Sequence, residues 1–227
     1  MDVFGKALKD FYHTQNVGKL WIHNNYGKPE EMPVEVFFRL ETDLSDLDEY
    51  ALRLCKGNIL DVGAGVGAHS FLLQSRGLSI TALEISESAC GIMKLRGIRK
   101  VVNENILFYS TTGYDTILML MNGIGLCGDI NGLNKMLPHL KTLIKPGGQL
   151  ILDSSDISYL YDNGNFPKDK YYGELVYQYE YQHIKGDWFK WLYIDFEHLK
   201  RIAESHALTC ELLYEDDMDQ FLARLTL

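Results

Sequence analysis

A glycine-rich run and two carboxylates form the clearest chemical pattern in the sequence. The run ILDVGAGVGA at 59–68 contains Asp61 two positions before Gly63, and Glu84 follows Gly63 by 21 positions. Glycines in such a run adopt positive φ and let the backbone approach a ligand closely. A carboxylate such as Glu84 can accept strong hydrogen bonds from both hydroxyls of a ribose. The pattern predicts a site for a ligand that carries a ribose.

The charge of Asp61 indicates which of two ribose-bearing ligands the site would accept. A dinucleotide such as NAD would bring a doubly negative pyrophosphate to the glycine turn, where the carboxylate would repel it. S-adenosylmethionine would bring a positive ammonium and a positive sulfonium. The spacing Gly63-x-Gly65-x-x-Ala68 fits a dinucleotide as well, so the spacing does not distinguish the two ligands. The negative charge of Asp61 favours S-adenosylmethionine over NAD. The structural alternative for Asp61 is a carboxylate satisfied by loop amides.

The elements around these residues predict an α/β fold. Short apolar strands alternate with amphipathic helices, which is typical of a parallel sheet covered on both faces. The expected strands are Ile59–Val62, Ser79–Leu83, Lys100–Val102, Thr116–Leu120 and Gln149–Asp153, and the expected helices are 68–76, 87–96 and 132–144. With Thr209–Tyr214 and Phe221–Leu227 as a closing antiparallel pair, we expect a doubly wound, mostly parallel seven-stranded sheet whose last strand is antiparallel.

Two further segments are expected to lie outside this sheet. Residues 1–57 read as an N-terminal helical lid, with an irregular stretch at Trp21–Pro33, and residues 58–227 as the core domain. Strict alternation in GELVYQYEYQ predicts a strand, and Lys185-Gly186-Asp187 predicts a turn into a second strand, so a β-hairpin is inserted at about 172–194.

Four motifs in this order resemble those of the class I, Rossmann-like S-adenosylmethionine-dependent methyltransferases. These are ILDVGAGVG, TALEIS with Glu84, YDTILMLMNGIG and LIKPGGQLILD. The resemblance covers Asn58–Asp153 closely and the terminal helix and strands less specifically. PVEVFFR at 33–39 is also similar to small-molecule members. The resemblance implies S-adenosylmethionine as cofactor and in-line methyl transfer to a small-molecule acceptor, with no universal catalytic base.

The resemblance also implies cofactor-binding residues. They are Asp61, Gly63, Ala64, Gly65, Glu84, Ile85, Asn105, Ile106, Met121 and Arg39. The glycine loop would contact the methionine part, Glu84 the ribose and Ile85 the adenine face. Asn105 stands where members often carry Asp, so its amide oxygen would accept from the adenine without charge, and Ile106 would offer its amide to the ring.

Arg39 is a candidate partner for the methionine carboxylate. A surface ion pair with Glu41 or Asp43 is the alternative.

The acceptor side is less well defined by the sequence. Trp21, Tyr26 and Asn122 are candidate substrate-binding residues, and either His23 or Tyr26 could deprotonate an acceptor, although a loop histidine without chemistry is the simpler interpretation. The many aromatic residues between 159 and 193 either wall an acceptor pocket or pack on the sheet or on a second subunit. We favour the packing interpretation, which makes a homodimer possible.

Composition excludes several classes of function. The 227 residues include 31 acidic and 22 basic ones, giving a formal net charge of −9, which disfavours nucleic acid as a partner. Residues 121–124 also lack the Asn-Pro-Pro-Tyr motif of base-flipping amino methylases. We expect no bound metal and no membrane segment, because ligand spacing and long apolar runs are missing. Four scattered cysteines indicate reduced thiols and a cytoplasmic location.

Two rival functions remain open. Tyr181-x-x-x-Lys185 superficially matches the catalytic pair of an NAD-dependent reductase, but that pair requires a shared helical face, and here it falls at a strand end and a turn. The second rival is a non-catalytic module that binds S-adenosylmethionine.

Overall fold

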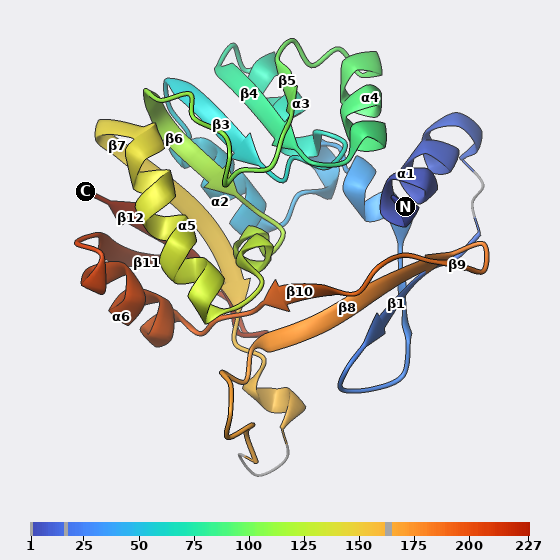
Figure 1. Ribbon diagram of the computed structural model, residues 1–227. Coiled ribbons are helices and arrows are strands. Elements are labelled where there is room, and N and C mark those ends of the chain that lie inside the picture. The colour runs from blue at the N-terminus through green and yellow to red at the C-terminus, as the bar shows by residue number, and fades with distance from the viewer. Residues whose placement is uncertain (1, 16–17, 162–164) are drawn as a thin grey trace.

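The computed structural model describes residues 2–15, 18–161 and 165–227, and these form two β-sheets flanked by helices (Figure 1). The larger one, the core sheet, has seven strands in the order β11-β12-β7-β6-β3-β4-β5. Its strands are β3 (Asn58–Val62), β4 (Ser79–Glu84), β5 (Val101–Asn103), β6 (Tyr114–Met119), β7 (Ile144–Ser155), β11 (Thr209–Glu215) and β12 (Gln220–Thr226).

The strand directions confirm the predicted doubly wound topology. Strands β5, β4, β3, β6 and β7 pair in parallel, whereas β12 pairs antiparallel with both β7 and β11. Strand β3 lies between β4 and β6, so the chain order reverses there. Open α/β sheets bind ligands at the carboxyl ends of the strands beside such a reversal, and the glycine run follows β3 directly.

Five helices cover the two faces of the core sheet. Leucines of α2 and α3 pack with Ile80, Leu118 and Ile151 on one face, whereas α5 and α6 pack with Ile117 and Leu150 on the other. The bounds are α2 (Asp46–Leu54), α3 (Ala68–Ser75), α4 (Glu87–Leu95), α5 (Ile130–Leu143) and α6 (Phe196–Ser205), with 3-10 turns η1 (Val34–Phe38), η2 (Glu41–Asp43), η3 (Gly123–Cys127) and η4 (Ser158–Leu160).

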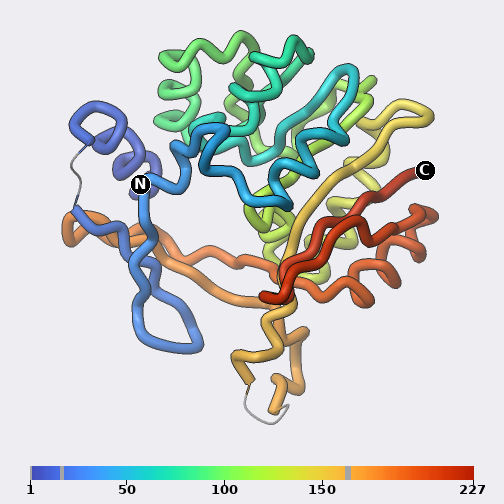
Figure 2. Tube along the Cα trace, turned by 180° about the vertical axis from the view of Figure 1, so that it is seen from behind, coloured from blue at the N-terminus to red at the C-terminus, as the bar shows by residue number. Residues whose placement is uncertain are grey.

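The second sheet contains strands from two distant parts of the chain. Its order is β10-β8-β1-β2, with β9 paired to β8. The strands are β1 (Leu20–Asn24), β2 (Glu30–Met32), β8 (Glu174–Tyr181), β9 (Ile184–Lys185) and β10 (Phe189–Leu192). Figure 2 shows the N-terminal segment and the hairpin side by side, away from the core sheet.

Two details of this second sheet differ from the prediction. The stretch Trp21–Pro33, expected to be irregular, contains β2 and most of β1, because β1 pairs with β2 on one edge and with the distant strand β8 on the other. The hairpin turn lies at Gln182 and His183, whose φ values are 51° and 65°, rather than at 185–187. A two-residue turn with two positive φ values matches the twist of paired strands.

Helix α1 (Val3–Thr14) joins the two sheets. Its Ala7 and Leu8 are fully buried and share a cluster with Ile92 of α4 and with Leu20 and Tyr181 of the second sheet. Asp2 caps this helix through Gly5 N, and its other oxygen accepts from Ser86 Oγ at 2.5 Å. The N-terminal segment is therefore helix and sheet together, held against the core. In the part of the chain that is described, no helix has the length and apolarity to cross a membrane.

Candidate functional site

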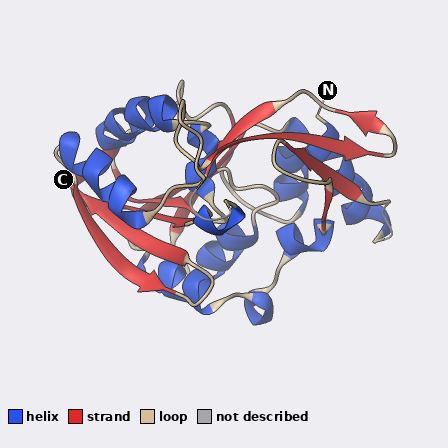
Figure 3. Cartoon of the chain, turned by 90° about the horizontal axis from the view of Figure 1, so that it is seen from below, coloured by secondary structure: helices blue, strands red, loops and turns tan. Residues whose placement is uncertain are grey.

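A cavity of about 1120 Å³ lies between the carboxyl ends of β3, β4 and β6 and the inner face of the second sheet. Figure 3 shows the second sheet from below, spread across the ends of the core elements. We call the wall formed by 61–66, 84–88 and 120–123 the donor wall, and the wall formed by β1, β2, β8, β10 and Tyr193 the acceptor wall. The volume exceeds the roughly 300–1,000 Å³ of a usual ligand pocket, so two small molecules fit.

The glycine loop on the donor wall is closed to phosphate. Gly63 and Gly65 have φ values of 71° and 55°, and no atom lies within 4 Å of a Cβ added at Gly65. The amides of Gly63 and Ala64 both donate to Leu83 O, and the amide of Gly65 donates to Glu84 Oε2 at 2.9 Å. A pyrophosphate site needs such amides free. Here they are used inside the protein.

Asp61 lies at the end of β3 and lines the cavity with only 3% of its surface exposed. Burial raises its pKa, while the charge of His69 and hydrogen bonds from Ser70 oppose that effect. Ser70 Oγ donates to Asp61 Oδ2 at 2.6 Å. The carboxyl group of Asp61 is therefore held at the first turn of α3 by Ser70 and also borders the cavity.

Glu84 ends β4 and also lines the cavity. Burial raises its pKa, and the amides of Ser86 and Gly65 lower it by donating to the two carboxylate oxygens. Each oxygen keeps a lone pair for a further donor. Ile85 beside it is 66% exposed and lines the same wall. The two residues lie where the sequence predicts contacts with a ribose and an adenine.

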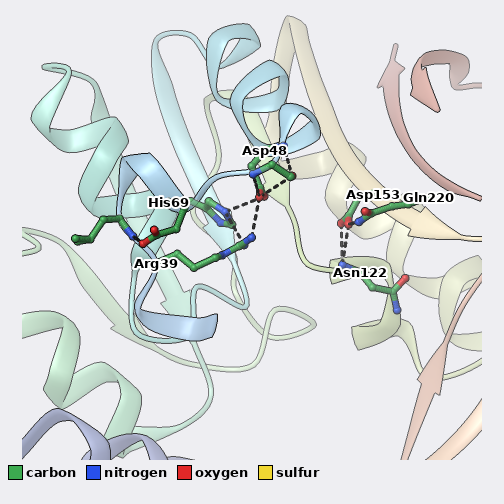
Figure 4. A network of polar contacts seen from close by, with 9 residues as sticks. Arg39, Asp48, His69, Asn122, Asp153 and Gln220 are labelled. Carbon is green, nitrogen blue, oxygen red and sulfur yellow. Dashed lines mark hydrogen bonds and ion pairs between the residues drawn. The ribbon is translucent and has the colours of Figure 1, made fainter. Parts of the chain in front are cut away.

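A polar triad of Asp48, His69 and Arg39 lies next to Asp61 and was missed by sequence reasoning. Asp48 accepts from Arg39 Nη1 at 2.8 Å and from His69 at 3.2 Å (Figure 4). Although burial alone would raise the pKa of Asp48, His69 and Arg39 hold it well below its usual range. His69 lines the cavity, whereas Arg39 does not. Arg39 forms its ion pair with Asp48 rather than with Glu41 or Asp43.

Met121 and Asn122 follow β6 and both line the donor wall with positive φ values of 62° and 54°. The amide N of Asn122 donates to both oxygens of Asp153, and its side chain donates to Leu192 O at 3.1 Å. Figure 4 shows Asp153 held between Asn122 and Gln220. The side chain of Asn122 thus fastens the second sheet to the core.

The acceptor wall carries the aromatic residues of the hairpin. Tyr177, Tyr179, Phe189, Trp191 and Tyr193 line the cavity. The packing interpretation that we favoured is therefore incomplete, because these rings form the wall as well as packing on one another. Because successive side chains of a strand point to opposite faces of a sheet, alternate residues of β8 and of β10 line the cavity.

The N-terminal strand β1 contributes differently from the prediction. Ile22 and, beyond the strand, Tyr26 line the cavity, whereas Trp21 and His23 do not. His23 instead pairs with Glu180 at 2.7 Å. The sequence alone could not show the side to which Trp21 points, because the strand itself was not predicted.

Asn105 and Ile106 are not among the residues that line the cavity. The side-chain oxygen of Asn105 accepts from Leu107 N at 2.9 Å, which closes a local turn. The side chain of Ile106 is buried in the main core cluster. Contacts of these two residues with an adenine remain a prediction that the geometry does not favour.

The ionisable side chains that line the cavity are mostly acidic. Among the described residues that line it, six carry carboxylates and none is Lys or Arg; the acids are Asp2, Glu30, Asp61, Glu84, Glu87 and Asp187. A doubly negative pyrophosphate has no partner here. The reductase motif also fails, because Tyr181 bonds Asp10 and Lys185 lies 3.6 Å from Glu180. Within the described residues, no cluster of His, Cys, Asp or Glu fits a metal ion.

Comparison with known proteins gives a consistent family. Residues 38–212 match the family model described as methyltransferase domain. A crystal structure of a SAM-dependent methyltransferase from Bacteroides fragilis in complex with S-adenosyl-L-homocysteine is 38% identical, covering 100% of this chain and 94% of that chain with a TM-score of 0.94. No curated protein matches the chain.

More distant structures share the fold alone. The DhpI-SAM-HEP complex is 14% identical over 80% of this chain and 84% of that chain, with a TM-score of 0.64. The CcbJ methyltransferase from Streptomyces caelestis is 14% identical over 80% of this chain and 94% of that chain, with a TM-score of 0.62. Together with the acidic cavity and the closed glycine loop, the family match and the full-length likeness show that this chain belongs to the S-adenosylmethionine-dependent methyltransferases.

Proposed function

We propose that the chain transfers the methyl group of S-adenosylmethionine to a small molecule bound against the acceptor wall. The observation that carries this proposal is the division of one cavity into a wall of loop backbone and carboxylates and a facing wall of aromatic side chains. The cofactor supplies an electrophilic methyl group on a positively charged sulfur. The chain's own task is to hold the two reactants in line, which can contribute roughly 7–11 kcal/mol to lowering the barrier.

The residues of the donor wall fit this cofactor. Glu84 would accept from the ribose hydroxyls, Ile85 would pack on the adenine, and the open backbone at Gly65 would border the amino-acid part. Asp61 would attract the ammonium group. Among the described residues, the side-chain atom Arg39 Nε is buried without a hydrogen-bond partner, whereas Arg39 Nη2 lies 3.4 Å from His69 Nε2. The orphaned donor supports Arg39 as a partner of the methionine carboxylate, whereas its ion pair with Asp48 and its position outside the cavity lining argue against a direct contact.

The remaining contacts and the division of the chain also stay proposals. We assign Gly63, Ala64 and Met121 to contacts with the cofactor and Tyr26 to contacts with the substrate, and we propose that Asn122 contacts the substrate from the donor wall. A lid formed by residues 1–57 over a core formed by 58–227 is supported by the packing of α1 against α4, whereas α2, which falls in the same segment, packs on the core sheet.

A small-molecule acceptor in the cytoplasm fits the chemistry best. The cavity is lined by carboxylates, whereas the phosphate backbone of a nucleic acid would require cationic side chains. Cys55, Cys90, Cys127 and Cys210 are all free thiols, as expected in a reducing compartment. Trp188 at the hairpin end is 53% exposed, and we propose it as part of a homodimer contact, which sedimentation velocity tests directly.

Calorimetry with S-adenosylhomocysteine and with NADH tests the proposal. We expect S-adenosylhomocysteine to bind in the micromolar range, about −8 kcal/mol, and NADH to give no heat. A screen of acceptors, in which formation of S-adenosylhomocysteine from S-adenosylmethionine is measured, then separates an enzyme from a module that only binds. Binding without turnover of any acceptor would favour the module.

A further inference from the structure

The acceptor wall is suited to a ligand without negative charge. Its rings lie close together, with the centroids of Tyr179 and Phe189 5.1 Å apart and those of Phe189 and Trp191 6.2 Å apart. Glu30 and Asp187 are exposed at its edge, and no Lys or Arg is among the described residues that line the cavity. An anionic acceptor would meet two carboxylates and no cation, whereas a cation would meet carboxylates and ring faces.

A chain of hydroxyl groups crosses this wall to the surface. Tyr26 Oη donates to Glu30 Oε1 at 3.2 Å and lies 3.4 Å from Tyr177 Oη. Tyr193 lines the same wall beside Tyr177 and contributes to the raised pKa of Tyr177. Because the single proton of Tyr26 points to Glu30, its oxygen accepts from Tyr177. The chain therefore runs outward from Tyr177 to an exposed carboxylate.

We propose, on the basis of the function proposed above, that the methyl acceptor is an amine on a flat apolar body, and that Tyr177, Tyr26 and Glu30 remove its proton. The ring faces of the wall hold the body and the incoming ammonium group. The hydroxyl chain gives the proton a route to water. No base has to be buried in the cavity.

The steps balance without an anionic acceptor. The ammonium nitrogen passes one proton to Tyr177 Oη, Tyr177 passes its own proton to Tyr26, and Tyr26 passes its proton to Glu30, which releases one to water. The freed lone pair then forms the N–C bond to the methyl group while the S–C bond breaks and its electron pair stays on sulfur. The product is a methylated ammonium ion, so the acceptor enters and leaves as a cation.

The same surroundings disfavour a phenol as acceptor. Burial raises the pKa of Tyr26 to about 12 and also raises those of Tyr177 and Tyr193. A bound phenol would equally be kept protonated, whereas burial of an ammonium group favours the neutral amine with its lone pair free.

The groups that face the hydroxyl chain are few. Asn24 donates to Glu30 Oε1 at 3.1 Å. Tyr193 interacts electrostatically with Tyr159, Glu30 and Asp153. None of these groups brings a positive charge to the chain, so a phenolate would find no stabilising partner here.

Competing acceptors on one scaffold test the class of substrate. Tyramine carries an amine and a phenol on one flat ring, and 3-(4-hydroxyphenyl)propionate carries a carboxylate in place of the amine. On protein saturated with S-adenosylhomocysteine, we expect tyramine to bind at least about tenfold more tightly, a difference of about 1.4 kcal/mol. With S-adenosylmethionine, mass spectrometry should place the methyl group on the tyramine nitrogen.

Three results overturn the amine proposal. They are equal or tighter binding of the carboxylate, methylation on the phenol oxygen, and no binding of either tyramine or tryptamine to protein that binds S-adenosylhomocysteine. If S-adenosylhomocysteine itself does not bind, the proposed function fails instead, so the two failures are distinguishable.

Variants test the proton route. Tyr177→Phe should lower kcat/KM for the amine about 100-fold near pH 7, and the deficit should shrink as the pH approaches the amine's own pKa, where the amine arrives neutral. Tyr26→Phe interrupts the same proton route at a second position, and because Tyr26 is 37% exposed this substitution leaves the core intact. A loss that does not change with pH contradicts the route.

Glu31→Gln is the matched control for Glu30→Gln. Glu31 lies on the same strand, pairs with Lys19 at 2.5 Å and does not line the cavity. We expect Glu31→Gln to leave kcat/KM and its pH profile unchanged, whereas Glu30→Gln should slow turnover near pH 7. S-adenosylhomocysteine should bind both variants as it binds the parent protein.

Discussion

The donor and acceptor walls of the cavity are built in different ways. Each part of the donor wall directly follows a core strand, so that Asp61, Glu84 and Met121 each lie within a few residues of the strand that positions them. The acceptor wall depends on β1 pairing with β8, and the contact between His23 and Glu180 spans 157 positions. Ligand contacts are local in one wall and depend on long-range pairing in the other.

This difference teaches where each wall can change. A donor wall made of backbone turns and two carboxylates tolerates little substitution, because Glu84 binds two amides of its own chain. An acceptor wall made of side chains on a sheet can alter its shape one residue at a time while the strand pairing stays constant. We expect the cofactor to be shared within the family and the acceptor to vary.

Glu84→Gln should give the largest effect and tests the donor wall alone. The substitution removes the charge and sets the NH2 group of a carboxamide against one of the two backbone donors, Gly65 N or Ser86 N, which bind different oxygens of Glu84. Charge-assisted bonds contribute about 1.5–3 kcal/mol each, so calorimetry should show S-adenosylhomocysteine binding at least about 100-fold more weakly. Glu104→Gln, at an exposed residue outside the cavity, is the control and should bind normally. Unchanged affinity in Glu84→Gln would remove the ribose contact from the donor wall.

Asp153→Asn tests the junction of the two walls through the pH dependence of stability. Burial raises the pKa of Asp153 to about 6, against hydrogen bonds from Asn122 and Gln220. Between about pH 4 and 6 the folded protein holds a proton here that the unfolded chain has lost, so stability falls as the pH rises. The full loss in the free energy of unfolding, about 3 kcal/mol, is reached above pH 6.

The asparagine side chain in Asp153→Asn cannot ionise, so the variant should not lose folding stability as the pH rises. Urea unfolding at several pH values should show its free energy of unfolding rising, relative to the parent protein, by about 3 kcal/mol between pH 4 and 7. Asp217→Asn, in an exposed turn, should show no such trend. A constant difference between Asp153→Asn and the parent protein would mean that Asp153 is ionised throughout.

Gly125→Ala should impair the acceptor wall without affecting the donor wall. A Cβ at Gly125 would lie 2.1 Å from Trp191 Cε2, so the indole must move out of the acceptor wall. Overpacking of this kind costs about 1–3 kcal/mol. We expect kcat/KM for the acceptor to fall about tenfold, with S-adenosylhomocysteine affinity unchanged. An equal loss of both would show that the walls are not independent.

Gly91→Ala should give the smallest effect and serves as the control for Gly125→Ala. Gly91 lies inside α4, and no atom is within 4 Å of an added Cβ. Alanine in a helix interior is favoured over glycine by about 0.5–1 kcal/mol. Thermal unfolding should therefore show a slight stabilisation with both walls unaffected. Destabilisation would contradict the open space around this helix.

The core sheet and the donor wall could be predicted because their signals are local. The run at 59–68 marks a strand, a turn and a helix within ten residues, and β3 and α3 follow that order. The position of Glu84 follows from the length of α3 and β4. The antiparallel closing strands were predicted for the same reason.

The acceptor wall could not be predicted in the same way. Strand β1 has no long alternating pattern, and its longer pairing, with β8, joins segments about 150 residues apart. The Asp48–His69–Arg39 triad joins three segments whose spacing carries no motif. Its one local signal is the capping box of Ser45 and Asp48, which indicates a helix start and says nothing of His69.

The pairing of β1 with β8 has a consequence for the order in which a nascent chain folds. Residues 20–24 leave the ribosome long before residues 174–181 exist, so β1 can pair with β2 but must wait with its other edge unpaired and with Ile22 lacking its contacts to β8. Such edges invite association with other chains, and late long-range pairing slows folding. A chain halted before residue 174 can complete β3 to β7 but not this sheet, so translation speed through the second half sets how long the first strands stay vulnerable.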